Sequence, residues 1–243
     1  MSAEESLALF HAGELPFRAL LRSIIAHDGW MIPASPEDLE RPVLWRMDDK
    51  LWLLAFTSNG HLESYLDKEN ADRSQRVDGR WLFGGLIPPV QGLVLDAGQP
   101  HGTQFNEEKF EYLRLWAQSL QVEMLLATMQ IDGEGLQLLR GFDGYRLPIV
   151  RSESGKAHIA LAPDAQGRKL AAVFTAEDCL EAFLQDAQGA YGDGLIVDTL
   201  DGASLFAQLN ALPLDGVVFN CSGPVKPSAV SLEMIGALVE KES

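Results

Sequence analysis

Residues 53–58 read LLAFTS, and residues 171–176 read AAVFTA. Both stretches begin with apolar residues and continue through Phe-Thr to a small residue. A Leu-Glu pair follows at the same spacing in each case, at residues 62–63 and 180–181. A single short match of this kind arises by chance, so a repeat can be inferred only if further matches occur in the same order.

A second pair of stretches supplies such a match. Residues 92–96 read GLVLD and residues 216–220 read GVVFN, and a proline stands four residues after each. The two matches occur in the same order along the chain, which indicates one module present in two diverged copies. We therefore expect two domains, at residues 1–120 and 121–243.

The patterns inside the two copies predict the same kinds of element. Each copy has two strand-like stretches joined by a turn, which predicts a β-hairpin followed by a helix. Each later has a short apolar stretch opened by glycine, which is typical of a buried central strand. Thr175 has the properties of an N-cap for the helix that follows it, and residues 132–135 have the composition of a turn. The other expected elements are hairpins within residues 43–56 and 157–174, helices at residues 60–66, after Asn106, at 203–212 and from near Ser228, and central strands at 93–95 and 217–219.

These elements predict an α/β fold of the α+β type, made of two similar small domains. Each domain is expected to be a mixed β-sheet packed with helices, and the two domains are expected to form a pseudo-dimer. All five tryptophans fall in the first copy. We expect them to serve as core residues rather than as interface anchors.

The composition excludes several classes of function. The chain has 19 Lys and Arg against 35 Asp and Glu, a formal net charge of −16. An acidic surface repels phosphate backbones, so DNA and RNA are poor candidate ligands. The N-terminus is acidic and no stretch approaches 18 consecutive apolar residues, so we expect neither an ordinary export signal nor a membrane span. With only two cysteines, a cytoplasmic location is expected, and the charge favours either simple solubility or a basic protein partner.

Residue patterns known from enzymes are absent, and we predict no catalytic residues. The sequence contains no P-loop, dinucleotide-binding, nucleophile-elbow or zinc-protease motif. The five histidines are scattered, so we expect neither a metal site nor a cofactor. Ligands of α/β folds bind in loops at the carboxyl ends of strands, and a helix N-terminus near Cys221 would lower its thiol pKa. The candidate binding residues are therefore Thr57, Asp96, His101, Thr175, Asn220 and Cys221.

Two stretches of the second copy resemble the SseB family. They are AVFTAEDCL at residues 172–180 and GVVFN with its following Gly-Pro at residues 216–224, and the first copy resembles the family more loosely at residues 56–58 and 92–98. The resemblance implies a small α/β domain of bacterial origin with no established enzymatic activity. The family name has been attached both to serine sensitivity and to type III secretion, and the resemblance carries over no catalytic residue.

The leading hypothesis is a bacterial, cytoplasmic, non-enzymatic module that binds a protein partner or regulates one, as a monomer or a homodimer. This hypothesis rests on two observations: the sequence lacks catalytic motifs, and the loops after the two central strands match. Two alternatives stay open. One is a small-molecule binder or enzyme that uses a cleft between the two copies, for which fold analogy is the only support. The other is an immunity-like or chaperone-like protein that binds a basic partner, which the net charge suggests.

Overall fold

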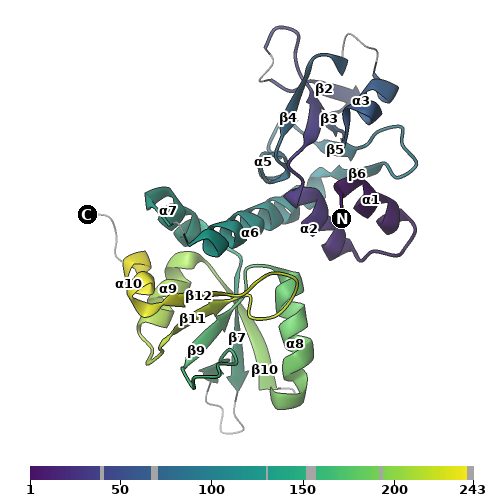
Figure 1. Ribbon diagram of the computed structural model, residues 1–243. Coiled ribbons are helices and arrows are strands. Elements are labelled where there is room, and N and C mark those ends of the chain that lie inside the picture. The colour runs from purple at the N-terminus through teal and green to yellow at the C-terminus, as the bar shows by residue number, and fades with distance from the viewer. Residues whose placement is uncertain (39–40, 67–70, 130, 152–156, 192–193, 240–243) are drawn as a thin grey trace. The chain divides into compact units, whose positions relative to one another are not determined.

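The structure is a computed structural model that describes residues 1–38, 41–66, 71–129, 131–151, 157–191 and 194–239 (Figure 1). The chain divides into two compact units, Met1–Gln118 and Ser119–Ser243. The boundary lies inside helix α6 (Phe110–Thr128), so the first part of this helix belongs to one unit and the remainder to the other. Several small sheets pack against helices, which confirms the expected α+β class.

The first unit is built around a four-stranded mixed sheet. Its elements, in chain order, are α1 (Ala3–His11), α2 (Phe17–Ala26), β1 (Trp30–Pro33), β2 (Leu44–Met47), β3 (Lys50–Ala55), α3 (Asn59–Tyr65), β4 (Ser74–Val77), α5 (Gly79–Gly84), β5 (Gly92–Leu95), β6 (Thr103–Asn106) and a 3₁₀ turn (Glu107–Lys109) that leads into α6. The sheet has the order β2-β3-β5-β6, with β3 and β5 parallel and the outer pairs antiparallel. Strands β1 and β4 form a separate antiparallel pair, which a bridge between Met31 and Phe56 links to the end of β3.

The second unit has the same kinds of element. In chain order they are α7 (Gly133–Gly141), β7 (Tyr145–Arg151), β8 (Ala157–Ile159), β9 (Leu170–Val173), α8 (Glu177–Tyr191), β10 (Leu195–Leu200), α9 (Gly202–Asn210), β11 (Gly216–Phe219), β12 (Ser228–Ser231) and α10 (Leu232–Val239). One sheet has the order β12-β11-β9, with β11 and β9 parallel, and the other has the order β10-β7-β8. Figure 1 shows α8 on one side of these strands and α9 and α10 on the other.

The two units share their order of elements and three of their strand pairings. The parallel pair β3–β5 corresponds to β9–β11, the antiparallel pair β5–β6 to β11–β12, and β1–β4 to β7–β10. The register also agrees, since Leu53 lies opposite Leu93 and Ala171 opposite Val217. The predicted central strands are confirmed, because β5 and β11 each lie between two neighbours. All four of these apolar side chains are buried, as burial on both faces of a central strand requires.

The two units differ at the predicted hairpins: β2 pairs with β3 as expected, whereas β8 pairs with β7. Within residues 157–174 the expected hairpin is present as a single bridge between Leu161 and Ala171.

A third pair of matching stretches lies at the start of α5 and α9. Residues 78–83 read DGRWLF and residues 201–206 read DGASLF. In both units the aspartate is the N-cap, and its carboxylate accepts a backbone N–H of the first turn. This match was available in the sequence and strengthens the correspondence between the units.

The glycine after each of these caps allows a close approach of two backbones. A Cβ atom at Gly79 would lie 2.5 Å from the carbonyl oxygen of Ile25, and one at Gly202 would lie 2.2 Å from that of Leu139. The helices therefore begin directly against the carbonyl ends of α2 and α7. Any side chain at these positions would push the two elements apart.

Two local predictions in the second unit, the cap at Thr175 and the turn at residues 132–135, are wrong. Helix α8 begins at Glu177, and Thr175 does not cap it, because the Thr175 hydroxyl is bonded to the side chains of Glu123 and Asn220. Residues 132–135 are not a free turn: Asp132 caps α7 by accepting the N–H of Gly135.

The helix cap predicted at Asn106 and the helix start predicted near Ser228 both fall on the last strand of their unit. Ser228 lies in β12, and α10 begins only at Leu232. Asn106 ends β6, and its side chain makes no capping hydrogen bond. Both stretches are short polar edge strands with a single buried residue in the pattern, which gives little strand signal in the sequence.

The tryptophans divide between core and surface. Trp30 and Trp116 are buried, whereas Trp81 is 56% exposed. The expectation of core positions is therefore correct for the first two and wrong for Trp81. Across the described residues, none of the helices combines the length and the apolar character that a membrane crossing requires.

Candidate functional site

The two units hold the loop after their central strand in the same way. Asp96 follows β5 with φ 48°, and Asn220 follows β11 with φ 51°. This left-handed conformation is one that aspartate and asparagine adopt more readily than other residues with a side chain. In the first unit Oδ1 of Asp96 accepts the backbone N–H of Thr57 at 2.8 Å. In the second unit Oδ1 of Asn220 accepts that of Thr175 at 3.0 Å, so each loop is tied to the end of the neighbouring parallel strand.

In the first unit the Asp96 carboxylate is fully buried and accepts four hydrogen bonds. Besides the N–H of Thr57, it accepts the O–H of Thr57 at 2.7 Å, Nδ1–H of His61 at 3.1 Å and Nε2–H of His101 at 3.2 Å. Nδ1 of His61 also lies 3.0 Å from the hydroxyl oxygen of Thr57. A carboxylate removed from water is tolerated only when its oxygens have such partners. The buried Asp96 thus orients two imidazole rings whose centroids are 5.4 Å apart.

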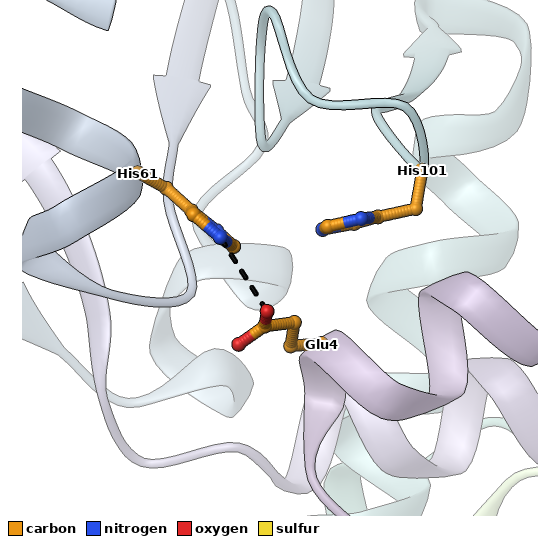
Figure 2. Close-up of side chains that lie close together, drawn as sticks. All are labelled: Glu4, His61 and His101. Carbon is orange, nitrogen blue, oxygen red and sulfur yellow. Dashed lines mark ion pairs between the residues drawn. The ribbon is translucent and has the colours of Figure 1, made fainter. Parts of the chain in front are cut away.

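A second carboxylate reaches the same two histidines from helix α1. Oε1 of Glu4 lies 3.4 Å from Nε2 of His61 (Figure 2). Ser2 caps α1, and Ala3 and Leu7 bury its inner face, which fixes the turn that carries Glu4. The Glu4 side chain is 51% exposed. One ligand atom each from Glu4, His61 and His101 lies within 4.8 Å of the other two.

The second unit has a counterpart of this network in which the buried loop residue is a neutral asparagine. Nδ2 of Asn220 donates to the Thr175 hydroxyl at 2.8 Å and to Oε1 of Glu123 at 3.4 Å. The Thr175 hydroxyl in turn donates to Glu123 at 3.3 Å. The helix carboxylate here interacts with a threonine and an asparagine, whereas Glu4 interacts with a histidine.

The buried positions of the helices show which residues correspond. Helix α1 precedes α2 as the end of α6 precedes α7, and Val122 and Leu126 repeat the buried spacing of Ala3 and Leu7. Glu123 therefore stands where Glu4 stands in the first unit. By the register of the matched stretches, Cys179 and Val225 occupy the positions of His61 and His101.

The structure joins the predicted site residues into two separate groups. Thr57, Asp96 and His101 meet in the first unit, and Thr175 and Asn220 meet in the second. Sequence reasoning missed three contributors to these groups, which are Glu4, His61 and Glu123. The interpretation of the histidines as isolated surface or turn residues is wrong for His61 and His101, because folding brings both to one buried carboxylate.

Cys221 does not have the lowered thiol pKa that its loop position suggested. Burial raises the pKa of the Cys221 thiol above its ordinary value, so the thiolate fraction at neutral pH falls. We expect iodoacetamide to alkylate Cys221 more slowly than a cysteine peptide at pH 7, and the rate to reach its midpoint at a higher pH. The measurement uses a Cys179→Ala chain, so that only Cys221 reacts. A midpoint below that of the peptide would contradict the assignment.

A small apolar cavity lies beside the Asn220 loop. Its volume is about 250 Å³, and Glu123 and Lys226 are its charged residues. The apolar residues that line it are Leu120, Met124, Leu126, Ala127, Phe219 and Val225. Pockets for small molecules usually measure about 300–1,000 Å³, so this cavity fits a side chain better than a metabolite. A second hollow of about 430 Å³ borders the equivalent loop of the first unit, next to Gly98 and Thr103.

Comparisons with known proteins find no family match for this chain. No protein-family model matches it, and none of the curated proteins matches it. Among solved structures, a match is titled "Anabaena Tic22 (protein transport)", with 11% sequence identity and a TM-score of 0.23, over 79% of this chain and 86% of that chain. The site described above therefore rests on the residues of this chain.

Proposed function

We propose that this chain is a bacterial, cytoplasmic, non-enzymatic binding protein, built as a tandem of two SseB-like modules, that takes up an apolar side chain of a protein partner. The observation that carries the proposal is the cavity of about 250 Å³ at the Asn220 loop. The shared element order and register of the two units support their origin as a tandem.

The polar groups of the matched loops favour binding over catalysis. The oxygens of Asp96 each accept two hydrogen bonds from within the unit, which leaves this carboxylate unsuited to act as a general base. The raised pKa of the Cys221 thiol opposes a role as nucleophile.

The lining of the cavity suits a protein partner. Met124 is 49% exposed at its edge, and methionine adapts its shape to the side chains that it contacts. Lys226 adds a charged group to the rim. With a net charge of −16, the chain also attracts basic partners at low ionic strength.

Partner capture with a pocket variant tests the proposal. The wild-type chain, Met124→Glu and Met129→Glu are each crosslinked in lysate of the source bacterium at low salt, and the captured proteins are identified by mass spectrometry. Met129 is 45% exposed and is not part of the cavity lining, so it is the matched control. We expect the same partner from wild type and Met129→Glu, and a loss of at least tenfold for Met124→Glu, because a carboxylate blocks apolar packing.

Two results would contradict the proposal. One is equal capture by all three chains. The other is a metabolite that raises the melting temperature of wild type and Met124→Glu alike without any captured protein, which would favour a small-molecule site such as the hollow near Gly98.

A further inference from the structure

We infer that the first unit binds one late first-row divalent metal ion, of which Zn²⁺ is the representative, through Glu4, His61 and His101. Two imidazoles and a carboxylate bind such ions in preference to Mg²⁺ or Ca²⁺. The three side chains come from α1, α3 and the loop between β5 and β6. In Figure 2 the two imidazole rings and the Glu4 carboxylate turn toward a common space.

The buried Asp96 prepares both histidines for a metal. Its Oδ1 accepts from Nδ1 of His61 and its Oδ2 accepts from Nε2 of His101. The proton of each ring is therefore placed on the nitrogen that faces Asp96. In the neutral rings the lone pair is then on Nε2 of His61, which faces Glu4 at 3.4 Å, and on Nδ1 of His101. A carboxylate behind a metal-binding histidine is the usual outer partner that fixes its tautomer and raises its basicity.

The spacing of the ligand atoms requires a small closure. Zn²⁺ binds nitrogen and oxygen at about 2.0–2.1 Å, which places tetrahedral ligand atoms about 3.3 Å apart. Oε1 of Glu4 is already 3.4 Å from Nε2 of His61, and the three ligand atoms lie within 4.8 Å of one another. Because the Glu4 side chain is half-exposed and not packed in the core, its carboxylate can rotate to complete the site. Three protein ligands leave a fourth position for water, so the ion exchanges with solvent.

The second unit serves as an internal control. It keeps the helix carboxylate as Glu123 and the loop residue as Asn220, but Cys179 and Val225 replace the two histidines. Asn220 also lacks the second carboxylate oxygen that Asp96 offers. Within the part of the chain that the structure describes, this ligand set occurs in the first unit, and we expect one ion per chain. The metal ligands and the residues that line the cavity of the second unit have no member in common.

Titration with the metal ions alone tests the site in the full-length chain. Isothermal calorimetry with Zn²⁺ should give a stoichiometry of one, and Co²⁺ should give visible absorption bands of four- or five-coordinate geometry. Glu4→Gln should weaken Zn²⁺ binding at least tenfold without harm to the fold, because Glu4 lies half-exposed on the surface. His101→Gln should abolish the Co²⁺ bands. The control is His158→Gln, at an exposed histidine of the second unit, which should leave both signals unchanged.

A further variant separates positioning from direct ligation. Asp96→Asn should keep the stoichiometry at one and weaken Zn²⁺ binding about 10–100-fold, the usual effect of losing an outer carboxylate. The inference is overturned if wild type gives no Zn²⁺ heat and no Co²⁺ bands, if it binds two ions, or if Glu4→Gln and His101→Gln both bind as wild type does. Circular dichroism of each variant shows whether a loss reflects the site or the fold.

Discussion

Gly202→Ala is expected to destabilise the second unit by more than about 3 kcal/mol. The new Cβ would lie 2.2 Å from the carbonyl oxygen of Leu139 and 2.7 Å from that of Arg140. Both are backbone atoms at the end of α7, so no side-chain rotation can relieve the overlap. The shift would also strain the hydrogen bond from the N–H of Gly202 to the oxygen of Phe142, now 2.9 Å long.

Urea unfolding followed by two signals measures this effect. Circular dichroism follows the unfolding of both units. Tryptophan fluorescence follows the unfolding of the first unit, because all five tryptophans precede residue 119. We expect an early circular-dichroism transition in Gly202→Ala and an unchanged fluorescence midpoint. The matched control is Gly133→Ala in α7, where a Cβ would meet nothing within 4 Å. Equal midpoints for both alanine variants would contradict the close approach of α9 to α7.

Asp96→Ala is expected to destabilise the first unit by about 3 kcal/mol. The N–H of Thr57 and Nε2 of His101 would lose this acceptor, whereas the Thr57 hydroxyl and Nδ1 of His61, which are 3.0 Å apart, would still have each other. Each buried donor left without an acceptor costs about 1–3 kcal/mol, and alanine tolerates the positive φ of this position poorly. The tryptophan fluorescence midpoint in urea should therefore fall.

Asp96→Asn is the control for this prediction. Asparagine retains the oxygen that accepts the N–H of Thr57, as Asn220 does for Thr175, and it tolerates the left-handed turn. Its unfolding midpoint should lie much closer to wild type. If the alanine and asparagine variants unfold at the same urea concentration, the side chain of Asp96 does not hold the loop as described.

The elements that the sequence predicted correctly are those with a strong local pattern. The helix expected at residues 60–66 is α3 (Asn59–Tyr65), and the helix expected at 203–212 is α9. Strands β5 and β11 are short apolar stretches whose burial on both faces follows from their composition. Elements with weaker patterns are predicted less well: the sequence indicates a loop and a helix cap at β6 and a helix start at β12, because half-polar edge strands give little strand signal.

The α+β class, the order of the central elements and the loop residues Asp96 and Asn220 follow from the amino-acid sequence, because they depend on short-range apolar spacing and turn chemistry. Which side chains meet at those loops follows from the packing of distant elements. His61 and Asp96 are separated by 35 positions in the chain. Glu4 contacts His61 from helix α1, and the sequence of α1 indicates only that one face of the helix is buried. A contact between distant residues depends on how strands pair and helices pack, and no local pattern records it.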